Sequence, residues 1–474
     1  MRDCRSRLIL IKETDGQPVQ CREMSQENQF ARLGLFKQNA PRYTSYPSAP
    51  QFGPGVQAPH FRRWLENVAP GSAVSLYVHI PFCRRLCWFC ACRTQGVRSD
   101  RPVLNYLHTV EAEIARVADA LPDGVVLSRL HWGGGTPTIL PPEGIASLAA
   151  TIRERLPFAP GAEFSVEIDP SEVDDPRLDA LADAGMNRAS IGVQDFAPEI
   201  QRAIGREQSF EITEKVARSL RARDINSLNA DMLYGLPFQD ERSIAETTRK
   251  VLALEPDRVA LYGYAHVPWM ARRQVMIRDD TLPDAEQRLE LSEIARDVFR
   301  SGGFNAIGID HFARPGDGLD TALRAGTLRR NFQGYTDDTS ETLIGTGASA
   351  ISRFSRGYVQ NAAATPAYLG QVESGGFAGV RGHEFSTDDR IRGHIIERLM
   401  CLYPVDFDRL EPDFGPAATG LTSRAASVHE TFRDFTTLAG NVFAIKPEGR
   451  SLTRLIAREF DAYFASGSGH SMAI

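Results

Sequence analysis

The sequence predicts an α/β protein with a partial (β/α)6 TIM-like barrel, an N-terminal strap and a smaller, mostly helical C-terminal domain. Short β-rich runs alternate with amphipathic helical patterns, each β-rich run ends in a polar or glycine-containing motif, and the alternation stops after about residue 385. Repeated βα units favour parallel strands joined by right-handed crossovers. The predicted segments are a tail at 1–40, the strap at 41–70, the barrel at 71–370 and the C-terminal domain at 385–474.

The strand candidates are short runs rich in β-branched and aromatic residues. Between them, apolar residues recur at three- and four-residue spacing, which is typical of a helix with one buried face. In the first such helix, one face carries Leu104, Leu107, Val110, Ile114 and Val117. The predicted strands are 75–80, 127–132, 163–168, 188–193, 227–235 and 258–265, and the predicted helices are 104–121, 210–225 and 285–303.

Each predicted strand ends in an unusual motif: HIPFC, GGGTPT, EIDP, VQDF, DMLYGLP and YAHVP, in that order. In a β/α barrel the carboxyl ends of the strands meet at one mouth, where active sites are built. A doubly wound open sheet is the competing architecture. Its ligands gather at one switch point, which needs no motif after every strand. The motifs therefore favour the barrel and one shared site.

The C-terminal domain has its own local signals. Ser386 is typical of a helix N-cap, and a helix is expected after it. Residues 443–464 predict a strand, a turn around Pro447 and a final amphipathic helix.

Composition limits the function classes. The net charge of −6 excludes a general binder of nucleic acid, so any anionic ligand needs a local basic site. No apolar run is long enough to span a bilayer, and the first residues show no signal-peptide pattern. We therefore expect a cytoplasmic protein with reduced thiols, in which Cys4, Cys21 and Cys401 are inert.

Four cysteines, Cys83, Cys87, Cys90 and Cys92, lie within ten residues. A structural zinc site normally recruits two distant pairs of ligands, and here the other cysteines are scattered. Three thiolates would instead leave one corner of a cubane iron–sulfur cluster without a protein ligand. A zinc knuckle or simple surface thiols remain the weaker alternatives.

The run CRRLCWFC, from Cys83 to Cys90, resembles the signature of the radical S-adenosylmethionine (SAM) enzymes. The resemblance implies that Cys83, Cys87 and Cys90 hold a [4Fe–4S] cluster whose fourth iron binds SAM. It further implies that an electron from the cluster cleaves SAM to a 5′-deoxyadenosyl radical.

A longer series of motifs is similar to one family of these enzymes, the oxygen-independent coproporphyrinogen III oxidases of haem (porphyrin) biosynthesis. The motifs include PRYTSYP, YVHIPFC, HWGGGTPT, GVQDF, DMLYGLP, GIDHFA, NFQGYT and GASAIS, in this order. The resemblance implies an anaerobic oxidative decarboxylation of coproporphyrinogen III to protoporphyrinogen IX. It also implies two bound SAM molecules, an external reductant and electron acceptor, and a monomer.

By the same resemblance, particular residues have roles at the cofactors. Tyr77 and Glu167 are expected at the first SAM, and the backbone of Gly134, Gly135 and Thr136 is expected to approach a charged ligand closely. The residues expected at the second SAM are Phe89, Gln194, Arg206, Asp231, Ala265 and Ile351.

Cys92 is expected near the substrate or the second cofactor; a packed thiol is its alternative. The substrate carries four carboxylates, so cations must meet them. The candidates are Arg42, Arg84, Arg85, Arg93, His311 and Arg330. Ala91, Arg93 and Gly205 depart from the family pattern, and the first two are expected on the substrate side of the cluster loop.

Two other hypotheses stay open at this point. One is a haem-binding carrier without decarboxylase activity, whose family lacks the fourth cysteine and the strap. The other is a radical methyltransferase that opens haem, which would form methylated tetrapyrrole and S-adenosylhomocysteine.

Overall fold

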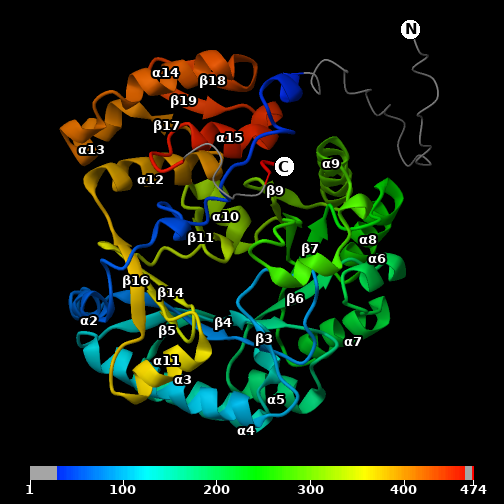
Figure 1. The fold of residues 1–474 in the computed structure, drawn as a ribbon, viewed down its shortest axis with the longest axis vertical. Helices are drawn as coiled ribbons and strands as arrows, with labels where there is room; N and C mark the ends of the chain where they lie inside the picture. Colours follow the sequence, from blue (N-terminus) through cyan, green and yellow to red (C-terminus); the bar gives the residue numbers. More distant parts are fainter. Residues whose placement is uncertain (1–28, 465–471) are drawn as a thin grey trace.

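The computed structural model describes residues 29–464 and 472–474 (Figure 1). Cys4, Cys21 and most of the predicted tail lie outside these residues. A central sheet of twelve strands forms the lower part of the molecule in Figure 1, and the C-terminal helices lie above it. The predicted fold class, a partial β/α barrel with a helical C-terminal region, is confirmed.

The parallel part of the sheet follows the chain without reversal. In the order β1, β4, β5, β6, β7 and β8, each strand pairs in parallel with the next, and β13 pairs in parallel on the other side of β1. In a doubly wound sheet the order of the strands reverses at a switch point, and no such reversal occurs here between β1 and β8. The strands in sheet order are β16 (Gly379–Glu384), β15 (Gly357–Asn361), β14 (Ile351–Phe354), β13 (Leu343–Thr346), β1 (Ala73–Ile80), β4 (Val126–Gly134), β5 (Phe158–Ile168), β6 (Arg188–Gln194), β7 (Ser227–Tyr234), β8 (Arg258–Gly263), β10 (His311–Ala313) and β9 (Asn305–Ile307).

Helices follow the parallel strands as expected for βα units. Most of their apolar stripes are buried on one core that includes Trp132 and Phe164, whose rings meet edge to face with centroids 4.9 Å apart. Ile200 and Leu319 lie in smaller separate clusters. The helices are α3 (Arg101–Ala120), α4 (Pro142–Arg155), α5 (Asp175–Asp183), α6 (Pro198–Ala203), α7 (Phe210–Arg221), α8 (Glu241–Ala253), α9 (Ala285–Ser301), α10 (Gly318–Ala325) and α11 (Thr365–Glu373).

The strap connects the two parts of the molecule. Its helix α2 (Ala58–Glu66) buries Phe61 and Trp64 in the core of the barrel. Upstream, Tyr43 and Tyr46 are buried in the core of the C-terminal part. The strap therefore packs against both, as the blue ribbon in Figure 1 shows.

The C-terminal part has its own apolar core and a small sheet in the order β17 (Val405–Asp406), β19 (Val442–Ile445) and β18 (Thr436–Ala439). The predicted cap is confirmed, because the Ser386 side chain accepts a hydrogen bond from the Asp389 N–H at the start of α12. The last helix, α15, is shorter than predicted and ends at Arg458. The helices are α12 (Thr387–Met400), α13 (Leu410–Phe414), α14 (Leu421–Thr431) and α15 (Thr453–Arg458).

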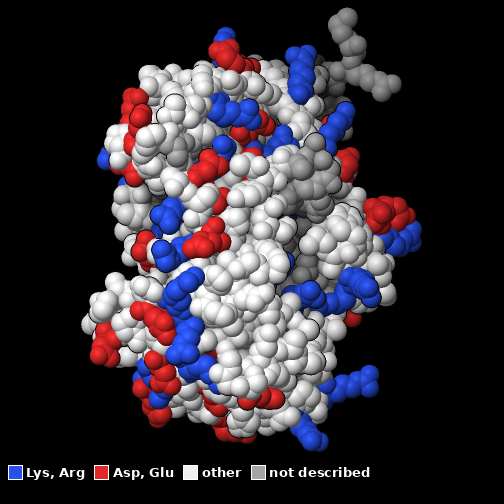
Figure 2. Space-filling model, turned by 60° about the vertical axis from the view of Figure 1, so that its left-hand side comes forward, with Lys and Arg blue, Asp and Glu red and all other residues white. Residues whose placement is uncertain are grey.

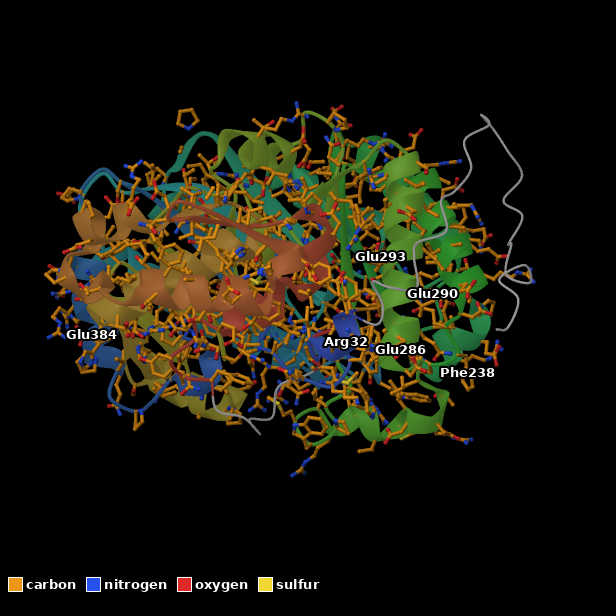
Figure 3. All side chains as sticks on the ribbon, turned by 90° about the horizontal axis from the view of Figure 1, so that it is seen from above. Arg32, Phe238, Glu286, Glu290, Glu293 and Glu384 are labelled. Carbon is orange, nitrogen blue, oxygen red and sulfur yellow. The ribbon has the colours of Figure 1, made fainter. Side chains whose placement is uncertain are left out.

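Two segments bear on the domain limits, which stay a prediction. Strand β16, beyond residue 370, pairs with β15 and so belongs to the central sheet. Within the predicted tail, Phe30 and Leu35 are buried in the core of the C-terminal part. Figure 3 shows Arg32 beside α9, close to Glu286, Glu290 and Glu293.

The surface mixes charges of both signs, as Figure 2 shows for one face. None of the described helices combines the length and the apolar character that a bilayer-spanning segment needs.

The buried carboxyl group of Glu113 joins α3 to the loop after β13, to β15 and to α11. Glu113 is fully buried and accepts hydrogen bonds from the Gly347 N–H at 2.7 Å, from Asn361 Nδ2 at 2.7 Å and from the Tyr368 hydroxyl at 2.6 Å. Burial raises the pKa of Glu113 to about 7, and these hydrogen bonds limit the rise. The carboxylate thus holds the loop between β13 and β14.

This pKa predicts a pH-dependent stability. Between the usual pKa of 4.5 and about 7, folded Glu113 keeps its proton while the unfolded chain loses it. The free energy of unfolding therefore falls as pH rises through this range, by up to about 3 kcal/mol. We expect Glu113→Gln to lose this part of the pH dependence in urea unfolding at pH 5 and pH 8. The exposed control Glu154→Gln on α4 should keep it, and equal pH dependence in both variants would contradict the prediction.

Candidate functional site

The register of the parallel strands places a row of polar side chains on one face of the sheet. Tyr77 of β1 lies opposite His131 of β4, which lies opposite Ser165 of β5. Because side chains alternate along a strand, Glu167 shares the face of Ser165. The same alternation, with Glu167 opposite Ser190 and Gly192 opposite Asp231, extends the row to β7. Tyr77, Glu167 and Asp231 are thus brought together as predicted for one mouth.

On the β1 side of this row the polar groups satisfy one another. The rings of Tyr77 and His131 are stacked, with centroids 5.7 Å apart, and the Tyr77 hydroxyl lies 2.9 Å from His79 Nδ1. Glu167 accepts hydrogen bonds from the Gly134 N–H at 3.0 Å and from His131 Nε2 at 3.3 Å. Burial raises the pKa of Glu167, but these hydrogen bonds outweigh it, so the pKa lies below its usual value. Glu167 is therefore an ionised acceptor.

The glycines after β4 are required by close packing. Gly134 has φ +111°, and a Cβ there would lie 2.5 Å from the His79 ring. A Cβ on Gly135 would lie 2.5 Å from the Phe82 carbonyl oxygen. The N–H groups of Gly135 and Thr136 donate to the carbonyls of Ile80 and Phe82. The motif therefore seats the cysteine loop, and its contact with a cofactor stays a prediction.

The four neighbouring cysteines lie on a loop that opens with β2 (Phe82–Cys83), which pairs with β3 (Gln95–Gly96). Cys87 is buried, Cys83 and Cys90 are half-buried, and Cys92 is exposed. A hydrogen bond from the Cys92 thiol is the main reason that the pKa of Cys90 falls to about 6. Thiolate is the form that binds metals.

The donor set fits an iron–sulfur cluster. Among the described residues, no three His, Cys, Asp or Glu side chains converge on a single metal ion. A cubane needs no such convergence, because each thiolate binds a different iron. The soft thiol donors Cys83, Cys87 and Cys90 match what such a cluster takes.

Arg206 lies against this loop. Its Nη1 is 3.6 Å from the Cys87 sulfur and 2.9 Å from an Asp169 oxygen, and its Nη2 donates to the Gly192 carbonyl at 2.9 Å. Its Nε is buried without a hydrogen-bond partner among the described residues. The guanidinium therefore places a positive charge beside a cysteine, a position that the sequence did not indicate. Its predicted contact with the second SAM stays a prediction.

At the other end of the row, Asp231 accepts hydrogen bonds from Ser190 Oγ and Asn229 Nδ2, both at 2.8 Å. Burial raises its pKa. Gln194 follows at a register shift after Gly192 and has φ +64°, which is rare for a residue with a Cβ.

Phe89 and Ala265, far apart in the chain, are joined by a residue that the sequence did not indicate. Gln274, fully buried in the turn η3 (Arg272–Met276), donates from Nε2 to the Phe89 carbonyl at 2.8 Å and to the Ala265 carbonyl at 3.0 Å. The neighbouring Arg273 donates to Thr94. No local pattern marks Gln274, because its role depends on a contact between two loops.

The candidate cations fall into two groups. His311 lies 2.7 Å from Asp310, and Arg330 lies 3.4 Å from the same carboxylate. Arg42 of the strap donates to the Gly263 carbonyl at 2.5 Å. The other candidates lie on the cysteine loop, where Arg84 pairs with Asp100, Arg85 donates to the Glu207 carbonyl and Arg93 is exposed. Ile351 begins β14, and its predicted cofactor contact is not tested by the structure.

Comparison with known proteins identifies relatives over nearly the whole chain. Residues 77–251 match the model of the Radical SAM superfamily. The chain is 57% identical to the oxygen-independent coproporphyrinogen III oxidase of Paracoccus denitrificans, over 95% of this chain and 100% of that one. It is 39% identical to the protein of the same name from Salmonella typhimurium, over 92% of this chain and 95% of that one.

A solved structure agrees. The coproporphyrinogen III oxidase of Escherichia coli, described as a radical SAM enzyme, superposes with a TM-score of 0.85 at 36% identity. The match covers 90% of this chain and 100% of that one.

We predict that the two hydrogen bonds from Gln274 Nε2 hold the cysteine loop in place. Gln274→Leu removes two hydrogen bonds to loop carbonyls and leaves those partly buried acceptors unsatisfied. We expect the variant, after anaerobic loading with iron and sulfide, to lose iron to a chelator several times faster than the parent protein. The matched control is Gln371→Leu on α11, whose amide oxygen has no partner among the described residues. Equal rates of iron loss in both variants would contradict the prediction.

Proposed function

This chain belongs to the family of oxygen-independent coproporphyrinogen III oxidases, and from that membership we propose that it decarboxylates coproporphyrinogen III to protoporphyrinogen IX in haem biosynthesis. The observation that carries the proposal is the 57% identity to a named oxidase over 95% of the chain, with the cysteine motif at the mouth of the barrel. Two propionates become vinyl groups. Each loses a hydrogen atom from the β-carbon, carbon dioxide and one electron, which an external acceptor takes.

Radical SAM proteins carry a [4Fe–4S] cluster and SAM, which when bound supply the 5′-deoxyadenosyl radical that removes the hydrogen atom. Cys83, Cys87 and Cys90 would hold the cluster, and Arg206 would offset the negative charge of the thiolates. We propose no ligand role for Cys92. Its thiol lies beside Cys90, on the exposed side of the loop, where a substrate can reach it.

The polar row would hold the cofactors. Glu167, ionised and next to Tyr77, suits an ammonium group or ribose hydroxyls of the first SAM. Support for a second SAM is the separate carboxylate of Asp231, together with the unpartnered Nε of Arg206. Phe89, Gln194, Ala265 and Ile351 complete the proposed second site.

The substrate would lie beyond Asp231, toward the strap. His311 of β10 and Asp231 of β7 both lie opposite Ala260 of β8, so the cations around Asp310 adjoin the second cofactor site. Arg42 and Arg330 are therefore the preferred partners for propionates. We propose a monomer in the cytoplasm, where the thiols stay reduced, with a reductant and an electron acceptor of unknown identity. No observation favours the carrier or the methyltransferase.

The test is anaerobic turnover with matched cysteine variants. The loaded protein, given dithionite, SAM and coproporphyrinogen III, should form tripropionate and protoporphyrinogen products. Cys87→Ala should lose iron and abolish SAM cleavage, because one cluster ligand is gone. Cys401→Ala, a buried cysteine in a separate core cluster, should keep both. Cys92→Ala should keep iron and SAM cleavage but lose product. Intact cluster and SAM cleavage without any tetrapyrrole product in the parent protein would refute the proposal.

A further inference from the structure

A small cavity of about 70 Å³ lies between the strap, α9, the end of β8 and the C-terminal part. Six arginines line it, and Asp310 is the only acidic side chain among its described lining residues. The arginines come from the whole length of the chain: Arg42, Arg288, Arg296, Arg330, Arg450 and Arg454. In a protein of net charge −6, this is a strong local concentration of positive charge.

Arg296 pairs with Glu293 at 2.6 Å, but the charges of Arg288 and Arg330 are incompletely compensated among the described residues. Arg330 faces Asp310 at 3.4 Å, but its Nε and Nη1 are buried without a hydrogen-bond partner among the described residues. Arg288 is 8% exposed, and its Nε is also buried without a hydrogen-bond partner among the described residues. Burial, and then repulsion by Arg296, lowers the pKa of Arg450 to about 10. Burial, and then repulsion by Arg42, lowers the pKa of Arg454 to about 9.

Buried guanidinium donors without partners, as on Arg288 and Arg330, destabilise a fold, so such a cluster points to an anionic ligand. Arginine suits a carboxylate because its donors match the two oxygens. The cavity has room for roughly two water-sized groups, which fits a carboxylate and excludes a whole tetrapyrrole ring.

The described end of the chain occupies part of this place. Arg288 Nη2 donates to the Ile474 backbone oxygen at 3.2 Å, and Arg454 Nη1 donates to the carbonyls of Met472 and Ala473, both at 3.0 Å. The segment is held otherwise by the Ala473 N–H, which donates to the Gln38 carbonyl at 2.9 Å, and by a bridge between Asn39 and Met472. In Figure 1 the end marked C lies close to β9. Backbone oxygens thus take donors that a carboxylate would use.

On the basis of the proposed function, we propose that this arginine cavity binds a propionate carboxylate that the substrate retains, and that residues 472–474 move aside to admit it. The cavity adjoins the proposed reaction site. Asp310 contacts both Arg330 and His311, and His311 of β10 and Asp231 of β7 both lie opposite Ala260 of β8.

A retained propionate is the better occupant for a physical reason. Several charge-assisted hydrogen bonds stabilise a carboxylate in the ground state, which opposes its loss as carbon dioxide. The same bonds on a propionate that does not react hold the ring in position without affecting the reaction. The cavity is therefore an anchoring subsite.

The first test measures binding of coproporphyrin III, the stable oxidised form of the substrate, to the cluster-loaded full chain by fluorescence under anaerobic conditions. Arg288→Gln should weaken binding by about tenfold or more, since a charged hydrogen-bond donor is lost, and Arg288→Lys should weaken it less. The control Arg242→Gln, on the exposed face of α8, should bind like the parent protein.

Cleavage of SAM without tetrapyrrole, and the affinity for SAM, serve as separate readouts. Both should be unchanged in Arg288→Gln, which distinguishes a substrate carboxylate from the carboxylate of SAM. Weakened SAM binding with unchanged coproporphyrin binding would overturn the inference. Equal coproporphyrin binding in Arg288→Gln and in the parent protein would also overturn the inference. In that case, turnover of coproporphyrinogen III by the parent protein would still support the proposed function.

A second test addresses the segment and does not depend on Arg288. Asn39 and Met472 form an antiparallel bridge, so Asn39→Cys with Met472→Cys can be joined by a disulfide that locks the segment in place. The locked protein should bind coproporphyrin III at least tenfold more weakly than the same protein after reduction with dithiothreitol. Equal binding in both states would show that the segment does not need to move.

Discussion

The hydrogen-bond register between parallel strands is the constraint on which the site depends. Because β1 to β7 pair in sequence order, Tyr77, Glu167 and Asp231 project from the same face at neighbouring strand ends. A shift of one residue in any pair would turn a side chain of this row into the helical layer. The single core beneath the sheet, with Trp132 and Phe164 in contact, holds this register in place.

Charge is distributed unevenly across the mouth. Near the cysteine loop, Arg206 and Asp169 form a nearly balanced pair beside Cys87. Toward the strap, arginines outnumber carboxylates, and backbone oxygens take some of their donors. The first arrangement suits a resident cluster of thiolates and iron, whereas the second suits an anion that arrives and leaves. The two ends thus fit a bound cofactor and a carboxylate-rich substrate.

Much of the fold was predictable because the apolar residues of helices and strands recur within a few positions along the chain. The strand and helix runs were confirmed, and Ser386 caps α12 as expected. The last helix ends at Arg458, earlier than its apolar pattern indicated, so packing and not amphipathicity determined its length. Gln274 escaped prediction because its hydrogen bonds to Phe89 and Ala265 exist only after two loops meet.

The sequence by itself determined the βα alternation, the spacing of Cys83, Cys87 and Cys90, and the resemblance to a family, since each is written in neighbouring residues. Only the tertiary structure decided which cations act together. Nothing in their local sequences marks Arg288 of α9 and Arg454 of α15. In the structure they meet Arg42 of the strap, which the sequence did indicate as a candidate cation. They share one cavity because the two cores and the strap pack against each other, and such long-range packing has no signature along the chain.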